Sequence, residues 1–174
     1  AAKEAGVEQV YVHAFLDGRD VAPDSGKGFV EELQKQMKEI GVGEIASISG
    51  RYYAMDRDKR FERMDLAYNA NVAKEGKSFT DPVNFVADSY NDDVYDDFVV
   101  PVYNSAIDGD VEDNDAVIFA NFRPDRAIQL ATLVTNPEFY KDKGYEPKVK
   151  LNNIYFVCMM HYADSVKGHV AFKP

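Results

Sequence analysis

The sequence predicts an α/β fold: a mostly parallel central sheet with helices on both faces, built as a single domain. Short apolar runs of strand length alternate along the chain with segments whose apolar residues recur at helical spacing. This alternation is typical of parallel strands joined by helices that cover the faces of the sheet. The length of 174 residues matches one domain with a sizeable core.

Apolar runs with the length of buried strands lie at Val10–Leu16, Ile45–Ser49, Ala116–Phe122 and Ile154–Met159. The middle of the chain is less regular and holds one further candidate strand, Phe98–Val102. The order of the strands in the sheet does not follow from the sequence.

Amphipathic segments between these runs predict helices. The first is marked by apolar residues at helical spacing over Phe29–Ile40, and Gly41 is expected to end it. A second is marked by Phe61, Met64 and Tyr68, and Arg57 is expected in its first turn. A third opens at Pro124, because proline is favoured in the first helical turn. Asp81, followed by a proline, predicts the start of a short fourth helix.

Composition and charge exclude several classes of protein. The net charge of −10 argues against general nucleic-acid binding, which needs a basic face. No apolar run approaches the ~20 residues that span a bilayer. The single cysteine, Cys158, lies in an apolar run and is expected to be a buried thiol without an intrachain disulfide. We therefore expect a cytoplasmic monomer with no nucleic-acid or membrane partner.

Both ends of the chain read as interior segments. Residues 1–10 resemble the tail of a helix that runs directly into a strand, and residues 167–174 stop without a closing element. We therefore expect an excised piece of a longer protein.

The arginines are gathered, whereas the lysines are scattered along the chain. Seven arginines fall in three short segments: Arg19; Arg51, Arg57, Arg60 and Arg63; Arg123 and Arg126. In an acidic protein this grouping indicates either a local anion site or surface salt bridges, and the composition leaves both open. Arginine suits phosphate and carboxylate groups because its planar fork donates two parallel hydrogen bonds and stays charged.

Three predicted strands each end in an arginine-bearing segment. VYVHAFL is followed by DGRD, IASIS by GRYY, and AVIFANF by RPDR. Ligands of open α/β sheets collect at the carboxyl ends of the strands, so we expect these three ends to share one edge of the sheet. Gly18 and Gly50 allow the sharp exits that such loops need.

Helical geometry divides the arginines further. At about 100° per residue, Arg57 and Arg126 fall within the apolar stripes of their helices and are expected to point toward the sheet. Arg63 falls about 120° from that stripe, toward water, and Arg60 stays undecided. The alternative is that Arg57 and Arg126 pair with carboxylates of the chain itself: Asp56, Asp58, Asp125 or Asp20.

The arginines expected in the pocket would recognise a small ligand with two or more negative charges: Arg19, Arg51, Arg57, Arg123 and Arg126. Asp20 is the catalytic candidate, because a carboxylate kept ionised by arginines can orient a ligand hydroxyl or accept its proton. It could equally brace an arginine. His13, inside a strand, is expected to be a hydrogen-bonded core residue. No metal site is expected, since no Cys/His cluster with ligand spacing is present.

Three long motifs closely resemble the phosphotransferase domain of cofactor-independent phosphoglycerate mutases. They are VHAFLDGRD at Val12–Asp20, SGRYYAMDRD at Ser49–Asp58 and NFRPDRAIQL at Asn121–Leu130. KGHVAFKP at Lys167–Pro174 is similar to the segment by which that domain leads back to the rest of the enzyme. The resemblance spans nearly the whole chain.

The resemblance implies a function in glycolysis. These isomerases interconvert 3-phosphoglycerate and 2-phosphoglycerate and have two domains. One belongs to the alkaline phosphatase superfamily and holds two divalent metals, typically manganese, and a serine that becomes phosphorylated. The other, similar to residues 1–174 here, holds the glycerate while it reorients and takes the phosphate back at the other hydroxyl.

The substrate contacts of the family transfer to matching positions in this sequence: Arg19, Asp20, Arg51, Arg57, Arg123 and Arg126. The nucleophilic serine and the metal ligands belong to the domain that this sequence does not contain. A substrate-binding histidine of the family lies upstream of the first residue, and a lysine contact lies beyond the last. We therefore expect this chain alone not to catalyse the mutase reaction and to carry no metal itself.

Two other readings remain at this level. The chain could be a stand-alone binding module for phosphorylated metabolites. It could also be a structural domain whose arginines only make internal ion pairs.

Overall fold

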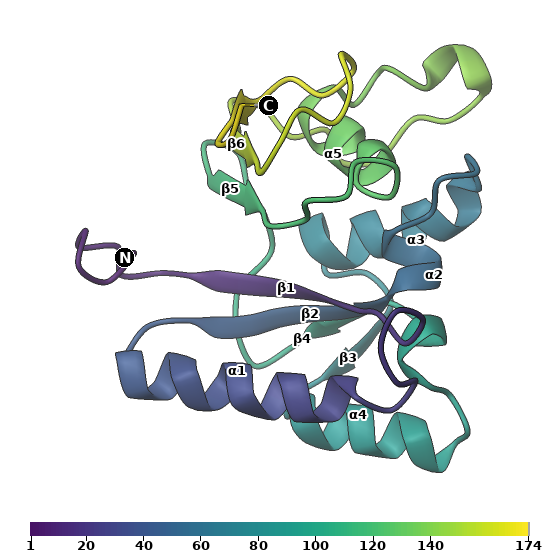
Figure 1. Cartoon of the computed structure of the whole chain (residues 1–174). Coiled ribbons are helices and arrows are strands. Elements are labelled where there is room, and N and C mark those ends of the chain that lie inside the picture. Colours follow the sequence, from purple (N-terminus) through teal and green to yellow (C-terminus); the bar gives the residue numbers. More distant parts are fainter. Residues whose placement is uncertain (174) are drawn as a thin grey trace.

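The computed structural model describes residues 1–173; Pro174, the last residue of the KGHVAFKP motif, lies outside the described residues. The chain forms two β-sheets with helices packed against them (Figure 1). The larger sheet has the order β1-β2-β4-β3, with bounds Tyr11–Leu16, Glu44–Gly50, Val102–Asn104 and Lys77–Phe79. The smaller sheet has the order β5-β6-β7, with bounds Ala116–Phe119, Tyr155–Cys158 and His169–Val170.

Most neighbouring strands run parallel, which confirms the predicted fold class. Only the β2–β4 pair is antiparallel among the described strands. The expectation that all three arginine-bearing strands share one sheet is wrong, because β1 and β5 are edge strands of separate sheets. Between them, the rings of Phe15 and Phe119 pack with centroids 5.9 Å apart.

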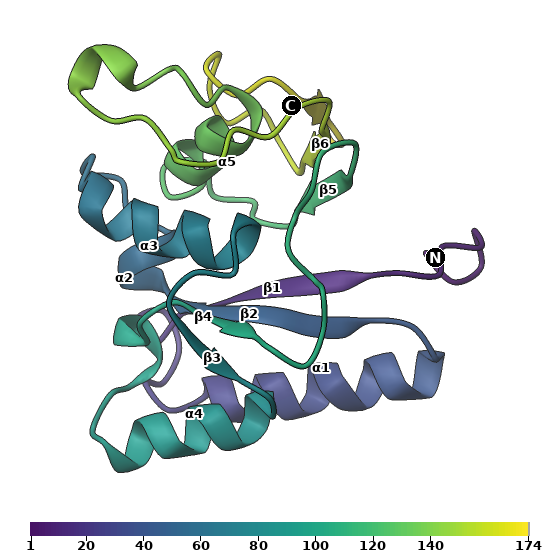
Figure 2. The same ribbon diagram turned by 180° about the vertical axis from the view of Figure 1, so that it is seen from behind.

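Helices cover both faces of the larger sheet (Figures 1 and 2). The helices and 3-10 turns have these bounds: α1, Gly26–Ile40; α2, Arg51–Ala54; α3, Phe61–Val72; α4, Pro82–Asn91; η1, Asp96–Phe98; α5, Ile128–Thr135; η2, Lys141–Lys143. α1 and α4 lie on one face, and α2 and α3 lie on the other. α5 packs between α3 and the smaller sheet. No described helix combines the length and apolar character needed to cross a bilayer.

Two hydrophobic cores hold these layers together. One lies between the larger sheet and the α1/α4 layer and includes Val30, Ile48 and Val86. The other joins α3, α5 and the smaller sheet and includes Leu133 and Phe156. Full burial of such a side chain stabilises the fold by about 1.5–3 kcal/mol. Cys158 is buried in this second core, as expected.

The predicted ends of two helices are confirmed. Gly41 follows α1 with a φ of +86°, and its N–H donates to the carbonyl of Met37 at 2.8 Å. Asp81 caps α4, because its side chain accepts hydrogen bonds from the N–H groups of Val83 and Asn84.

Two other helices begin later than predicted. α3 starts at Phe61, so Arg57 precedes it, and α5 starts at Ile128, so Arg126 lies in the turn before it. The apolar-stripe argument for both arginines is therefore wrong. Before α3, the Asp56 side chain binds backbone N–H groups, and Lys59 adopts a left-handed φ of 57°. Such local bonds compete with helix formation.

The candidate strand Phe98–Val102 is wrong in its position. The chain makes the η1 turn as far as Phe98, and pairing begins at Val102 in β4. The turn forms because the Asp96 side chain reaches back to the start of α1, where it accepts a hydrogen bond from the N–H of Gly26 at 2.6 Å.

His13 is hydrogen-bonded within the fold, as expected. Its Nδ1 lies 2.7 Å from Oγ of Ser47, which in turn donates to Asn71 at 2.8 Å. Burial lowers the pKa of His13 to about 4, against the opposing effect of nearby Asp110 and Asp115. The imidazole is therefore neutral near pH 7.

We expect His13 to make the protein acid-sensitive. The unfolded chain binds a proton here below pH 6.5, whereas the folded protein does so only near pH 4. The free energy of unfolding should therefore rise with pH between 4 and 6.5. Acidification through this range should lower it by up to about 3 kcal/mol. The loss should be smaller to the extent that the His13 side chain contacts solvent. Urea titrations at several pH values measure the effect. The variant His13→Gln should lack this part of the pH dependence; identical profiles would contradict the assignment.

Candidate anion-binding site

The loop after β1 presents Arg19 at the carboxyl end of the larger sheet. The Asp17 carboxylate accepts hydrogen bonds from the N–H groups of Arg19 (3.1 Å) and Asp20 (3.2 Å), which closes a tight turn. Gly18 in this turn has a φ of +68°, a conformation that favours glycine. Nε of Arg19 donates to Asp97 at 2.7 Å. The turn and this contact fix the position of Arg19.

Arg51 is the first residue of α2, directly after β2, and is only 4% exposed. Its Nη1 donates to Asp17 and, at 2.8 Å, to Asp20. Burial raises the pKa of Asp17, but hydrogen bonds from Arg51 and from the turn backbone outweigh it, so the net pKa is lowered. Asp20 therefore braces Arg51, while its side chain stays 65% exposed.

A buried cluster holds the loop before α3. The Asp56 carboxylate accepts hydrogen bonds from the N–H groups of Asp58 (3.1 Å) and Arg60 (3.0 Å) and from Nε2 of Gln129 (2.8 Å). The side-chain oxygen of Gln129 accepts the N–H of Lys59 at 2.8 Å. Gln129 belongs to α5, so these bonds tie the loop to the helix that packs on the smaller sheet.

Arg57 and Arg123 share one carboxylate. Nη1 of Arg57 donates to Asp125 at 2.6 Å, and Nε of Arg123 donates to it at 2.7 Å. The hydrogen bond from Arg123, together with that from Arg57, lowers the pKa of Asp125. Internal pairing is therefore present for Arg57. Both arginine side chains are about half exposed, 45% for Arg57 and 59% for Arg123, so a ligand can reach them.

Arg126 lies close enough to Arg51, Arg57 and Arg19 to feel their charges, and it is only 8% exposed. Its Nη1 donates to the carbonyl of Met55 at 3.0 Å, and its buried Nε has no hydrogen-bond partner among residues 1–173. The pKa of Arg126 is lowered, first by burial and then by the positive charges of Arg51, Arg57 and Arg19. The structure thus brings these four arginines together, although they come from both halves of the molecule.

The expected solvent-facing position of Arg63 is wrong. Its guanidinium lies over the ring of Tyr52, 3.8 Å from the centroid, and reaches Asp56 at 3.6 Å. α2 packs against α3 and so places the tyrosine over this arginine, where a cation–π contact stabilises it. Arg60, which the sequence left undecided, is exposed at the start of α3.

Two carboxylates that hold the arginines were not predicted to do so. Asp17 lies in the DGRD segment, where an aspartate before a turn is itself a sign of side-chain-to-backbone bonding. Asp97 lies 78 residues from Arg19 in an irregular segment, and no local pattern connects the two residues.

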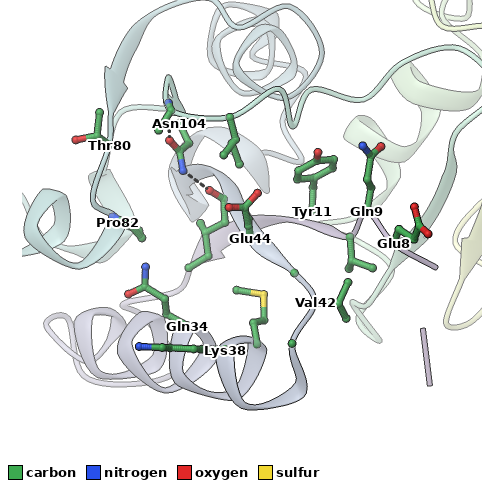
Figure 3. A pocket seen from close by; sticks show the side chains of 17 residues that line it. Glu8, Gln9, Tyr11, Gln34, Lys38, Val42, Glu44, Thr80, Pro82 and Asn104 are labelled. Atoms are coloured by element: carbon green, nitrogen blue, oxygen red, sulfur yellow. Dashed lines mark hydrogen bonds between the residues drawn. The ribbon is translucent and has the colours of Figure 1, made fainter. Parts of the chain in front are cut away.

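A hollow of about 750 Å³ lies at the opposite end of the larger sheet (Figure 3). Tyr11 and Glu44, at the starts of β1 and β2, line it together with Asn104. The Asn104 amide is satisfied by the backbone of Ile45 and Ala106. No arginine occurs among the described residues that line this hollow. We therefore place the anion site at the arginines and not in the hollow.

Comparison with known protein families gives a match over most of the chain. The family model described as "BPG-independent PGAM N-terminus" matches residues 1–164. The chain belongs to this family. The family assignment made from the sequence motifs is thereby confirmed.

Relatives of this N-terminal mutase domain carry the name 2,3-bisphosphoglycerate-independent phosphoglycerate mutase. The chain is 54% identical over 179 residues to the Listeria welshimeri protein and 51% identical over 180 residues to the Clostridium perfringens protein. Each alignment covers 99% of this chain but 34% of the relative, so the chain spans about a third of their length. A crystal structure of Leishmania mexicana phosphoglycerate mutase, 28% identical, matches 92% of this chain and 31% of its own with a TM-score of 0.80.

The described part of this N-terminal mutase domain offers no metal centre. Within residues 1–173, no group of three or more His, Cys, Asp or Glu side chains is arranged to hold a metal ion. The carboxylates near the arginines are instead engaged as acceptors of arginine hydrogen bonds. The described residues therefore do not fit a site for the two divalent metals, which the family resemblance assigns to the other domain.

Proposed function

We propose that residues 1–174 are the substrate-holding domain of a phosphoglycerate mutase, an isomerase that interconverts 3-phosphoglycerate and 2-phosphoglycerate in glycolysis. Family membership supports the reaction class. The observation that carries the site is Arg126, a buried guanidinium with an unpartnered Nε and with the charges of three further arginines acting on it. Such a cluster is electrostatically unfavourable alone and is relieved by a ligand with several negative charges.

The arginines would divide the two anionic groups of the substrate between them. Arg19 and Arg51 follow strands β1 and β2 of the larger sheet. Arg57 and Arg123 both donate hydrogen bonds to Asp125. Arg126 would contribute to both groups of contacts from the centre. Planar guanidinium forks match both phosphate and carboxylate oxygens, so either end of a phosphoglycerate fits this arrangement.

Asp20 is the proposed catalytic contact. It already accepts a hydrogen bond from Arg51, and it stays largely exposed toward solvent. From this position it would accept a hydrogen bond from the glycerate hydroxyl. That bond would hold the hydroxyl in one orientation and give its proton an acceptor when the phosphate returns.

The transfer of the phosphate is assigned to the other domain of the same polypeptide. We propose that this domain belongs to the alkaline phosphatase superfamily and supplies the phosphorylated serine and the two divalent metals, typically manganese. The chain described here would bind, orient and release the glycerate. A cytoplasmic monomer remains our expectation for the whole protein.

Titration of this chain with 3-phosphoglycerate tests the proposal. Four or five charged contacts give a gross gain of about 6–15 kcal/mol, and association costs roughly 4–15 kcal/mol. Binding should therefore be weak and should weaken further with added salt. Arginine side-chain NMR signals would report it, and glycerate without phosphate is the matched control ligand.

Two outcomes would contradict the proposal. Unchanged signals of Arg51, Arg57 and Arg123 up to tens of millimolar ligand would favour a structural domain, which the internal pairs with Asp125 and Asp20 also support. Robust turnover of 3-phosphoglycerate by this chain alone would show that it does more than hold the substrate.

A further inference from the structure

The segment 96–99 lies between the two loops that carry Arg19 and Arg51. The N–H of Asp96 donates to the carbonyl of Pro23 at 3.0 Å. The N–H of Gly50 donates to the carbonyl of Val99 at 2.7 Å. One short stretch of chain is thus hydrogen-bonded both to the end of β2 and to the connection between β1 and α1.

Asp96 anchors this segment to α1. Its side chain is fully buried and accepts a hydrogen bond from the N–H of Gly26 at 2.6 Å and another from the Tyr90 hydroxyl. Burial raises the pKa of this carboxyl, partly offset by the two hydrogen bonds. These bonds hold the backbone of the next residue, Asp97, in a defined place.

The segment packs closely against two glycines. A Cβ placed on Gly18 would lie 2.9 Å from the N of Asp97, and one on Gly50 would lie 2.3 Å from its carbonyl oxygen. Both glycines belong to the arginine-bearing loops. The Asp97 backbone is therefore in close contact with both loops at once.

The Asp97 side chain reaches from this fixed backbone to Arg19. Its Oδ2 accepts a hydrogen bond from Nε of Arg19 at 2.7 Å. The carboxylate is 11% exposed, whereas the Arg19 side chain is 39% exposed. In residues 1–173 the Nη groups of Arg19 have no recorded partner, so they are the part of its fork that a ligand can use.

We propose that Asp97 is a positioning residue of the anion site: it holds the Nε side of Arg19 so that the two Nη groups face the ligand. This inference rests on the proposed function. It explains why an acidic residue lies, nearly buried, against an anion-binding arginine. A carboxylate behind the guanidinium fixes its orientation, and the ligand then does not have to order a mobile side chain.

The test is a double-mutant cycle on 3-phosphoglycerate binding by this chain. We expect Asp97→Asn to weaken binding about tenfold, since the neutral amide holds the charged fork less strongly than the carboxylate does, while the side-chain shape is kept. Arg19→Ala should weaken binding at least as much. In the Arg19→Ala background, Asp97→Asn should then have little further effect, because Asp97 acts through Arg19. Asp92→Asn, an exposed carboxylate after α4, is the matched control.

A second measurement needs no variant to fold. In the wild-type chain without ligand, the Nε–H signal of Arg19 should show slowed exchange with water, as expected for a hydrogen bond to a carboxylate. Rapid exchange of this signal would overturn the inference. It would also be overturned if Asp97→Asn and Arg19→Ala each weakened 3-phosphoglycerate binding by the same factor alone and in combination. If the wild-type chain does not bind 3-phosphoglycerate at all, the proposed function fails. If it binds but Asp97→Asn binds equally well, only the positioning role fails.

Discussion

Replacing Arg126 by methionine is expected to weaken 3-phosphoglycerate binding about 100-fold or more while making the ligand-free protein more stable. The lost guanidinium would remove two or more charged hydrogen bonds to the ligand, each worth about 1.5–3 kcal/mol. In the free protein the same group is buried, lacks a carboxylate partner in the described residues and is repelled by Arg51, Arg57 and Arg19. A methionine of similar length should therefore stabilise the fold by about 1–3 kcal/mol.

Calorimetric titration and thermal unfolding of the same samples measure both effects. For a chain of this length, 1 kcal/mol corresponds to about 2–4 °C in the melting temperature. Lys35→Met, an exposed cation on α1, is the matched control and should change neither property by much. A lower melting temperature of Arg126→Met with unchanged binding would show that Arg126 is a structural residue.

Replacing Gly50 by alanine is expected to be the most destabilising of the glycine-to-alanine substitutions among the described residues. The added Cβ would lie 2.3 Å from the carbonyl oxygen of Asp97 and 2.7 Å from the N of Val99. Both are backbone atoms of a segment that Asp96 anchors to α1, so the contact cannot be relieved by turning a side chain. We expect a loss of about 3 kcal/mol or more in the free energy of unfolding, above the usual range for overpacking.

Gly28→Ala is the matched control for this prediction. Gly28 lies inside α1, where an added Cβ meets nothing within 4 Å. Alanine is favoured over glycine in a helix by about 0.5–1 kcal/mol, so this variant should be more stable than the wild type. Urea unfolding of the two variants should move in opposite directions. Equal midpoints would mean that the 96–99 segment yields easily, and the positioning role of Asp97 would lose its structural basis.

The local carboxylates explain how an acidic protein keeps five arginines in one region. Asp17, Asp20, Asp97 and Asp125 each accept at least one arginine hydrogen bond. Every one of them contacts part of a guanidinium group. The positive charge of this region is therefore partly compensated within the chain, and Arg126 is the arginine that remains without a carboxylate partner among residues 1–173.

The sequence by itself determined the fold class, most of the elements and the family. Apolar runs placed β1, β2, β5 and β6, because burial demands apolar side chains whatever their neighbours are. The end of α1 at Gly41 and the cap of α4 at Asp81 were also predictable, since both depend on bonds that span only a few residues. The motifs identified the family because each of them is a continuous stretch of sequence.

The tertiary structure decided how these parts meet. Whether β1 and β5 share a sheet depends on strand pairing between residues about a hundred positions apart, which periodicity does not encode. The start of α3 differs from the predicted one because Asp56 and Gln129, 73 residues apart, bind the loop before it. Helical phase placed Arg63 in water, but a tyrosine on a neighbouring helix covers it. Asp97 became part of the site only because folding brings it, across 78 residues, against Arg19.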